Sequence, residues 1–201
     1  MLFRSAELAE PVCPVPAGAT PEVTVEFAAE NGSPISVTFT PTQSTGVLAT
    51  IARDDCIGVL AAEHADVSVA ESIRWTPGTR EPALLELIIT PTGAAGSLAL
   101  VDARSTNLLS LVDDSGANVE QLPLGLVAAA DSPEQRVTLR LVPARCDPHA
   151  IAEDKRGTIM VVDVETRDGD GAVESSGAAY FRSSDEVKAA LYAFVADYCA
   201  S

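Results

Sequence analysis

Short runs of alternating apolar and polar residues, separated by turn-forming residues, most constrain the fold of this chain. One run extends from Val23 to Phe27 and another from Ile35 to Phe39. Alternation with a period of two is typical of a strand with one buried face. Asn31-Gly32, between the two runs, favours a two-residue hairpin turn. This segment therefore predicts an antiparallel hairpin with one face buried.

Similar patterns predict further strands at residues 46–52, 65–75, 83–92 and 137–141. Residues 158–181 form another expected hairpin, which turns at Asp168-Gly169-Asp170-Gly171. This turn offers carboxylates as a calcium loop does, but the glutamate that such a loop needs is missing, so a plain turn is favoured. Short strands at this spacing indicate a β-sandwich, in which Trp75 is expected to pack in the core or at an edge.

The C-terminal segment has a different pattern. Ser183 followed by Glu186 forms a capping box, so a helix is expected over about residues 184–199. Apolar residues then recur at helical spacing from Val187 to Tyr198. Cys199 follows Val195 by four positions, which places its sulfur on the apolar face of the helix.

The small-residue stretch at residues 91–96 is the expected break between modules. The predicted fold is mostly β, with two immunoglobulin-like β-sandwich modules. Residues 1–20 form an extended N-terminal segment, residues 21–94 the first module, and residues 95–201 the second module with its C-terminal helix. A short helix is expected after Cys146.

Four cysteines give information about the compartment. Cys13, Cys56, Cys146 and Cys199 are widely spaced and include no CxxC pair, so they lack the local geometry of a zinc or thioredoxin-like site. Two disulfides are the better interpretation, and two cysteines in each half favour Cys13 with Cys56 and Cys146 with Cys199. Disulfides predict an exported protein in an oxidising compartment. Four buried free thiols in a cytosolic interaction module are the alternative.

The composition argues against several classes of function. The 201 residues carry 29 acidic and 13 basic side chains, and the formal net charge is −16. A field of this sign repels phosphate backbones and anionic lipids, so no nucleic-acid partner is expected. No apolar stretch is long enough for a transmembrane helix, and the start of the sequence has no secretory signal pattern. An exported protein would have lost its signal before Met1.

The segment RCDPHAIAEDKRGT, residues 145–158, combines a cysteine, a histidine and several charges. Asp147 is a suitable N-cap and Gly157 a suitable stop, so a strand end followed by a short helix accounts for it. A metal site is the alternative, because His149 and Glu153 are four residues apart on one helix face, beside Asp147. The only other histidine, His64, is in the other half.

This segment, followed by a β-hairpin and a terminal helix that bears a cysteine, resembles a signature of uncharacterised secreted or lipoprotein-like proteins of Actinobacteria built from immunoglobulin-like β modules. The resemblance covers roughly residues 95–201, most specifically 136–160 and the LPLG at 122–125. It implies a β-sandwich in the cell envelope or outside the cell. It supplies no catalytic residues, and it leaves lipid anchoring open.

No catalytic motif accompanies these features: the sequence has no GxSxG, HExxH, P-loop or GxGxxG pattern. We therefore expect a non-enzymatic, extracytoplasmic binding or structural module of a bacterial cell envelope, with a protein or cell-wall partner and no cofactor. The alternative function is a metal-binding protein or metal-dependent enzyme centred on His149, Asp147 and Glu153.

Overall fold

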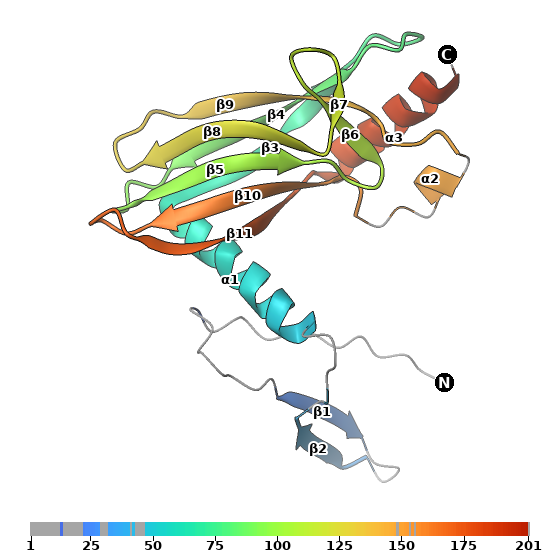
Figure 1. Cartoon of the computed structure of the whole chain (residues 1–201). Helices are drawn as coiled ribbons and strands as arrows, with labels where there is room; N and C mark the ends of the chain where they lie inside the picture. The colour runs from blue at the N-terminus through green and yellow to red at the C-terminus, as the bar shows by residue number, and fades with distance from the viewer. Residues whose placement is uncertain are drawn as a thin grey trace. The chain divides into compact units, whose positions relative to one another are not determined.

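The structure of the chain is a computed structural model (Figure 1). It describes Cys13, residues 22–28, 32–40, Thr42, 47–147, 149–152, Asp154 and residues 156–200. The chain divides into two compact units, residues 1–56 and residues 57–201, and the boundary falls within helix α1 (Val47–His64).

The first unit contains the N-terminal hairpin expected from the sequence. Strands β1 (Val23–Ala28) and β2 (Pro34–Phe39) pair antiparallel, with Val25 opposite Val37. Gly32 has a positive φ of 82°, as a hairpin turn requires, whereas Asn31 lies outside the described residues. The expectation of a buried face is wrong, because Val25, Ile35, Val37 and Phe39 are 38–47% exposed.

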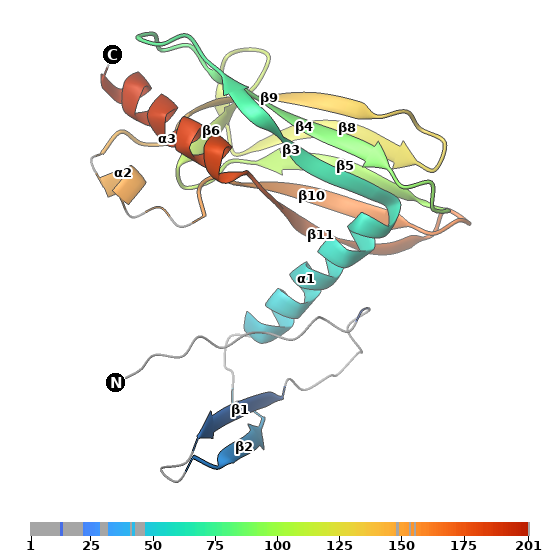
Figure 2. The same ribbon diagram turned by 180° about the vertical axis from the view of Figure 1, so that it is seen from behind.

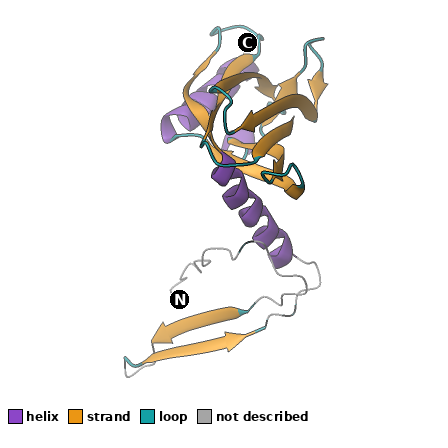
Figure 3. Ribbon diagram, turned by 90° about the vertical axis from the view of Figure 1, so that its left-hand side faces the viewer, coloured by secondary structure: helices purple, strands orange, loops and turns teal. Residues whose placement is uncertain are grey.

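The second unit is a sandwich-like arrangement of two antiparallel sheets. One sheet has the strand order β11-β10-β5-β8 and the other β3-β4-β9-β6-β7. Figure 1 shows these strands side by side, and Figure 3 shows them from another side, coloured by type. The bounds are β3 (Ala65–Arg74), β4 (Ala83–Pro91), β5 (Ser97–Arg104), β6 (Leu109–Val112), β7 (Asn118–Val119), β8 (Gln121–Ala129), β9 (Gln135–Pro143), β10 (Ile159–Arg167) and β11 (Val173–Arg182). The expectation of a mostly-β, sandwich-like fold is confirmed.

The core between the sheets follows from the alternation along each strand. Leu85 on β4 lies opposite Leu139 on β9, and both side chains are almost fully buried. On the facing sheet, Met160, Val162 and Val164 of β10 are buried in the same apolar cluster. Each fully buried aliphatic side chain contributes roughly 1.5–3 kcal/mol to folding. The intervening residues of each strand therefore form the outer faces of the sandwich.

Two helices follow the strand sequence of the second unit. Helix α2 (His149–Ala152) is a single short turn, and helix α3 (Asp185–Ala200) runs beside β3 (Figure 2). Its buried residues Val187, Leu191, Phe194 and Val195 join the core cluster. The predicted C-terminal helix is confirmed, but its cap differs by one residue. Ser184 Oγ accepts the hydrogen bond from Val187 N, whereas Ser183 Oγ donates to the carbonyl oxygen of Thr158.

One expected strand is wrong. Residues 46–52 read as a strand because of their β-branched residues, but residues 47–52 form the start of α1. The helix continues through an alanine-rich sequence in which Ile57, Ala61 and His64 are buried at helical spacing. The helical period of these buried residues therefore explains why the segment folds as a helix and not as a strand.

The module break expected at residues 91–96 is also absent. This segment connects β4 of one sheet to β5 of the other, and β4 pairs with β9, whose sequence lies beyond residue 95. Residues 65–94 and 97–200 therefore share one sandwich, so residues 21–94 do not form a separate one. At Gly96 the small residue lets two backbone segments lie close together. Gly96 has a φ of 100°, and a Cβ added there would lie 2.3 Å from the Arg167 carbonyl oxygen.

Candidate functional site

The outer face of the β3-β4-β9 sheet carries a row of three residues on adjacent strands. Arg74 on β3 lies opposite Leu84 on β4, and Leu84 lies opposite Arg140 on β9. Directly opposed residues of paired strands have their side chains on the same face. Neighbouring strands lie about 4.8 Å apart, so the two arginine backbones are separated by roughly 10 Å with an aliphatic side chain between them.

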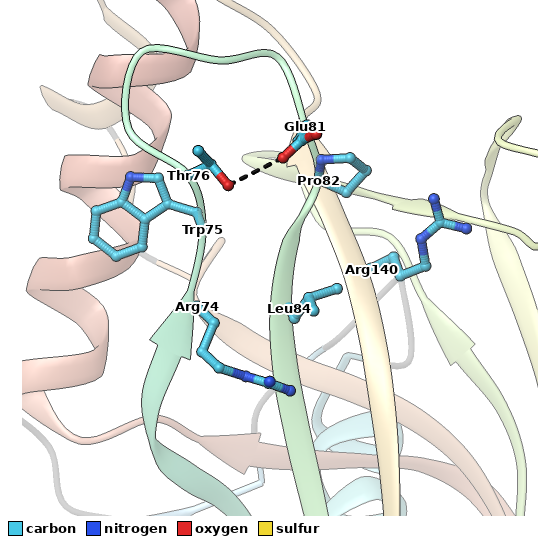
Figure 4. A pocket seen from close by; sticks show the side chains of 7 residues that line it. All are labelled: Arg74, Trp75, Thr76, Glu81, Pro82, Leu84 and Arg140. Carbon is cyan, nitrogen blue, oxygen red and sulfur yellow. Dashed lines mark hydrogen bonds between the residues drawn. The ribbon is translucent and has the colours of Figure 1, made fainter.

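This row forms the floor of an open cleft of about 450 Å³ (Figure 4). The cleft is lined by Arg74, Trp75, Thr76, Glu81, Pro82, Leu84 and Arg140. Residues 75–82 connect β3 to β4, and Thr76 Oγ1 donates a hydrogen bond of 3.0 Å to Glu81 Oε2 across this connection. The lining therefore combines two guanidinium groups, one carboxylate and an apolar floor.

Each arginine of the cleft donates a hydrogen bond that fixes its orientation. Arg74 Nη2 donates to Glu86 Oε1 at 3.2 Å, and Arg140 Nη1 donates to the carbonyl oxygen of Asp113 at 3.0 Å. The pKa of the Asp113 carboxyl is lowered, first by the hydrogen bond from the Ser115 side chain and then by one from the Ala117 backbone. The turn that orients Arg140 therefore keeps its carboxylate ionised.

Behind the cleft, Trp75 packs on helix α3. Its ring meets Phe194 edge-on, with ring centroids 6.3 Å apart, and Phe194 meets Tyr198 in the same way at 5.6 Å. In Figure 4 the indole of Trp75 points toward the helix side, away from Arg140. Trp75 Nε1 is buried and has no hydrogen-bond acceptor among the described residues. Trp75 is therefore a packing residue, as the sequence predicts.

The structure pairs Cys13 with Cys56 and Cys146 with Cys199, as the sequence favours. The Cα atoms are 5.4 Å apart in each disulfide. The second disulfide joins the segment after β9 to the last turn of α3, so it ties the helix to the sandwich.

Asp147 and His149, two of the metal-site candidates, follow Cys146 of this disulfide closely in the sequence. Asp147 Oδ1 accepts a hydrogen bond from His149 N at 3.0 Å, and Asp147 Oδ2 lies 3.2 Å from Arg145 Nε. Asp147 is therefore the N-cap that the sequence suggests. Glu153 lies outside the described residues, so the proposed His149–Glu153 pair stays a prediction.

The second histidine is in a separate place in the fold. His64 ends α1, its ring is buried, and its Nε2 lies 3.5 Å from Glu174 Oε2 on β11. Within the described residues, no group of three or more His, Cys, Asp or Glu side chains is arranged to hold a metal ion. His64 and His149 thus belong to different surroundings.

The arginine row was not predicted from the sequence, and the reason is physical. Local patterns locate β3, β4 and the outward position of Arg140, but they do not show that β4 and β9 are neighbours. These two strands are far apart in the sequence, and their pairing depends on the common core that both of them bury. The only local signal is an arginine at an outward position of β3 and of β9.

The chain matches no protein-family model, and a comparison with curated proteins finds no match. No helix within the described residues has the length and apolar character needed to cross a membrane.

Proposed function

We propose that this chain is a non-enzymatic, exported binding module of a bacterial cell envelope, and that the cleft around Arg74, Leu84 and Arg140 contacts its partner. The observation that carries this proposal is the open arginine-lined cleft on a sandwich that a disulfide ties together. An oxidising compartment is the setting in which two disulfides persist.

The chemistry of the cleft supports a binding role. Guanidinium groups present several hydrogen-bond donors in a fixed plane, and the Leu84 side chain between them provides apolar contact area. Glu81 and Thr76 add acceptors at the rim. Such a surface suits a polar partner with both acceptor and donor groups, such as a cell-wall polymer or an exposed protein loop. The resemblance to secreted actinobacterial proteins supports the envelope location.

Co-sedimentation tests this function. The purified protein is mixed with an actinobacterial envelope fraction, and the bound share is measured before and after protease treatment of that fraction. A cell-wall partner survives the protease, whereas a protein partner is lost. We expect the wild type to sediment with at least one of the two fractions and the Arg74→Ala/Arg140→Ala double variant to remain largely in solution.

Arg167→Ala is the matched control, because Arg167 is a half-buried arginine on the other sheet, paired with Glu165. This variant should sediment like the wild type. Equal sedimentation of the wild type and the double variant would contradict the proposal. So would a wild type that sediments with neither the untreated nor the protease-treated fraction. So would turnover in a broad hydrolase screen that a change at a cleft residue abolishes.

A further inference from the structure

The outer face of the other sheet carries a second cross-strand row, formed by Arg104, Val161 and Tyr180. Val161 on β10 lies opposite Arg104 on β5 and opposite Tyr180 on β11. Opposed residues share a face, so Arg104 and Tyr180 stand on either side of an aliphatic side chain. This arrangement repeats the pattern of the first row with an aromatic ring in place of one arginine.

A second guanidinium lies over the tyrosine of this row. The Cζ atom of Arg156 is 5.0 Å from the centroid of the Tyr180 ring, which is the geometry of a cation–π contact. Arg156 is exposed, and no carboxylate of the described residues forms an ion pair with it. An aromatic ring therefore positions its charge, and no carboxylate in the described part of the chain neutralises it.

The backbone next to Arg156 is held in place. Gly157 N donates to Asp154 Oδ1 at 2.7 Å, and the Gly157 carbonyl accepts from Thr106 Oγ1 at 2.8 Å. A Cβ at Gly157 would lie 2.4 Å from the Leu108 Cβ, so the chain is packed closely there. Because the corner is fixed before any ligand arrives, binding at Arg156 orders little additional backbone.

Arg104 supplies the other positive charge. Its Nε and Nη2 donate to the two carboxylate oxygens of Asp163 at 2.7 and 2.6 Å. That hydrogen bond, more than the charge of Asp163, raises the pKa of the Arg104 guanidinium. The fork leaves the Nη1 amino group available as a donor. Asp163 thus orients Arg104 and at the same time competes for it.

The two arginines face one cleft of about 290 Å³. Its lining consists of Arg104, Ser105, Thr106, Asn107, Arg156, Ile159, Val161 and Tyr180, and none of these carries a carboxylate. This is unusual for a chain with a net charge of −16. At physiological salt the Debye length is about 8 Å, so acidic residues beyond that range weaken the local positive potential only slightly. The nearby Asp163 offsets part of the charge of Arg104.

We propose that this cleft binds a single anionic oxygen group, a carboxylate or a phosphate, between Arg156 and Arg104. Both groups present oxygens that guanidinium donors match in geometry. Ser105, Thr106 and Asn107 add polar atoms at the rim, and Val161 and Ile159 form an apolar wall. The site explains why the segment RCDPHAIAEDKRGT ends in a tightly held Arg156-Gly157 corner. It lies on a different sheet from the cleft of Figure 4 and does not depend on that cleft.

Isothermal titration calorimetry at low ionic strength and pH 7 tests the site, with sodium phosphate and sodium acetate as separate probes. We expect saturable binding of at least one anion to the wild type. Arg156→Gln should weaken that binding by about tenfold or more, because it removes a charge-assisted hydrogen bond. Tighter binding of phosphate would indicate a ligand that presents a phosphate group, and tighter binding of acetate would indicate a ligand that presents a carboxylate.

Two further variants make the test specific. Arg136→Gln removes an exposed arginine of the other sheet, which pairs with Glu134, and should leave binding unchanged. Asp163→Asn removes the competing carboxylate and should tighten binding a few-fold. Absence of binding by both anions, or equal binding by the wild type and Arg156→Gln, would overturn the proposal. These outcomes are independent of co-sedimentation with the envelope fraction.

Discussion

The two outer faces of the sandwich carry rows of the same design but are supported in different ways. Arg74, Leu84 and Arg140 are backed by the packing of Trp75 against Phe194. Arg104, Val161 and Tyr180 adjoin a corner that hydrogen bonds hold at Gly157. Cross-strand register alone thus places an arginine beside an aliphatic residue in both rows.

The difference in charge follows from the neighbours of each row. Glu81 lines the first cleft and Glu86 pairs with Arg74, so that face offers donors and acceptors together. The second cleft has no carboxylate in its lining, and although Asp163 pairs with Arg104, Arg156 adds a second guanidinium over Tyr180. The first face therefore suits an extended polar partner, and the second suits one small anionic group.

The largest expected effect concerns the disulfide that ties α3 to the segment after β9. The Cys146→Ser/Cys199→Ser variant should lower the free energy of unfolding by about 4 kcal/mol, the chain-entropy value for a loop of this length. Cys13→Ser/Cys56→Ser opens a loop of similar length in the first unit, and we expect it to leave the main transition of the sandwich in place. Guanidinium unfolding followed by circular dichroism measures both. Equal losses in the two variants would show that the units unfold together.

A substitution at Gly157 should have the next largest effect. Gly157→Ala places a Cβ within 2.4–2.8 Å of Leu108, Asp154 and Asn107, so overpacking should cost about 1–3 kcal/mol. Gly58→Ala is the control, because Gly58 lies in α1 with open space around it, and this change should be neutral or stabilising by up to about 1 kcal/mol. Thermal unfolding of both variants would show whether the corner is as tightly packed as the structure indicates.

The same corner predicts a dependence of stability on alkaline pH. Burial, followed by the hydrogen bond that Tyr192 donates to Asp154, raises the pKa of Tyr192 to about 12. An unfolded tyrosine ionises near pH 10, so the unfolded state holds fewer protons between pH 10 and 12, and stability should fall with rising pH in that window. Ultraviolet titration should show one late-ionising tyrosine that is lost in Tyr192→Phe. That variant should also flatten the pH dependence.

The smallest effect is expected behind the first row. Trp75→Phe keeps the edge-on contact with Phe194 and removes a buried indole N–H that has no acceptor among the described residues. The gain from removing that polar group offsets part of the packing loss, so stability should change by less than about 1 kcal/mol. Chemical unfolding of this variant beside Trp75→Ala measures the effect. A loss of stability as large as that of Trp75→Ala would show that the indole N–H has a hydrogen-bond acceptor in the folded protein.

The sequence predicted strands β3, β4, β9, β10 and β11, whereas it did not predict strands β5 to β8 or the arrangement of the sheets. Period-two alternation locates β4 and β10, and helical spacing locates α3, because each depends only on nearby residues. The expected separation into two sandwich modules failed because β4 and β9 share a sheet across that boundary. Residues 47–52 were misread as a strand because a short apolar run fits both periods until the following residues extend it.

The site residues divide in the same way. The spacing of the cysteines and their distribution between the halves favoured the pairing that the structure has. The capping role of Asp147 also follows from local sequence. The rows of Arg74 and Arg104 were not predictable, because each requires the pairing of a strand that is distant in the sequence, β9 beside β4 in the first row and β5 beside β10 in the second. Arg156 was visible within RCDPHAIAEDKRGT, but its contact with Tyr180 depends on how the corner folds back on β11.

Amide-resolved NMR titration of the full chain with phosphate, and separately with acetate, would test the contrast between the two faces most directly. We predict that for at least one anion the chemical-shift changes gather at Arg104, Arg156, Val161 and Tyr180, saturate, and leave the row of Arg74, Leu84 and Arg140 unchanged. Shifts of equal size in both rows, or weak shifts spread over all exposed arginines, would contradict the account. Such a result would mean that the two faces do not differ in their ability to concentrate positive charge.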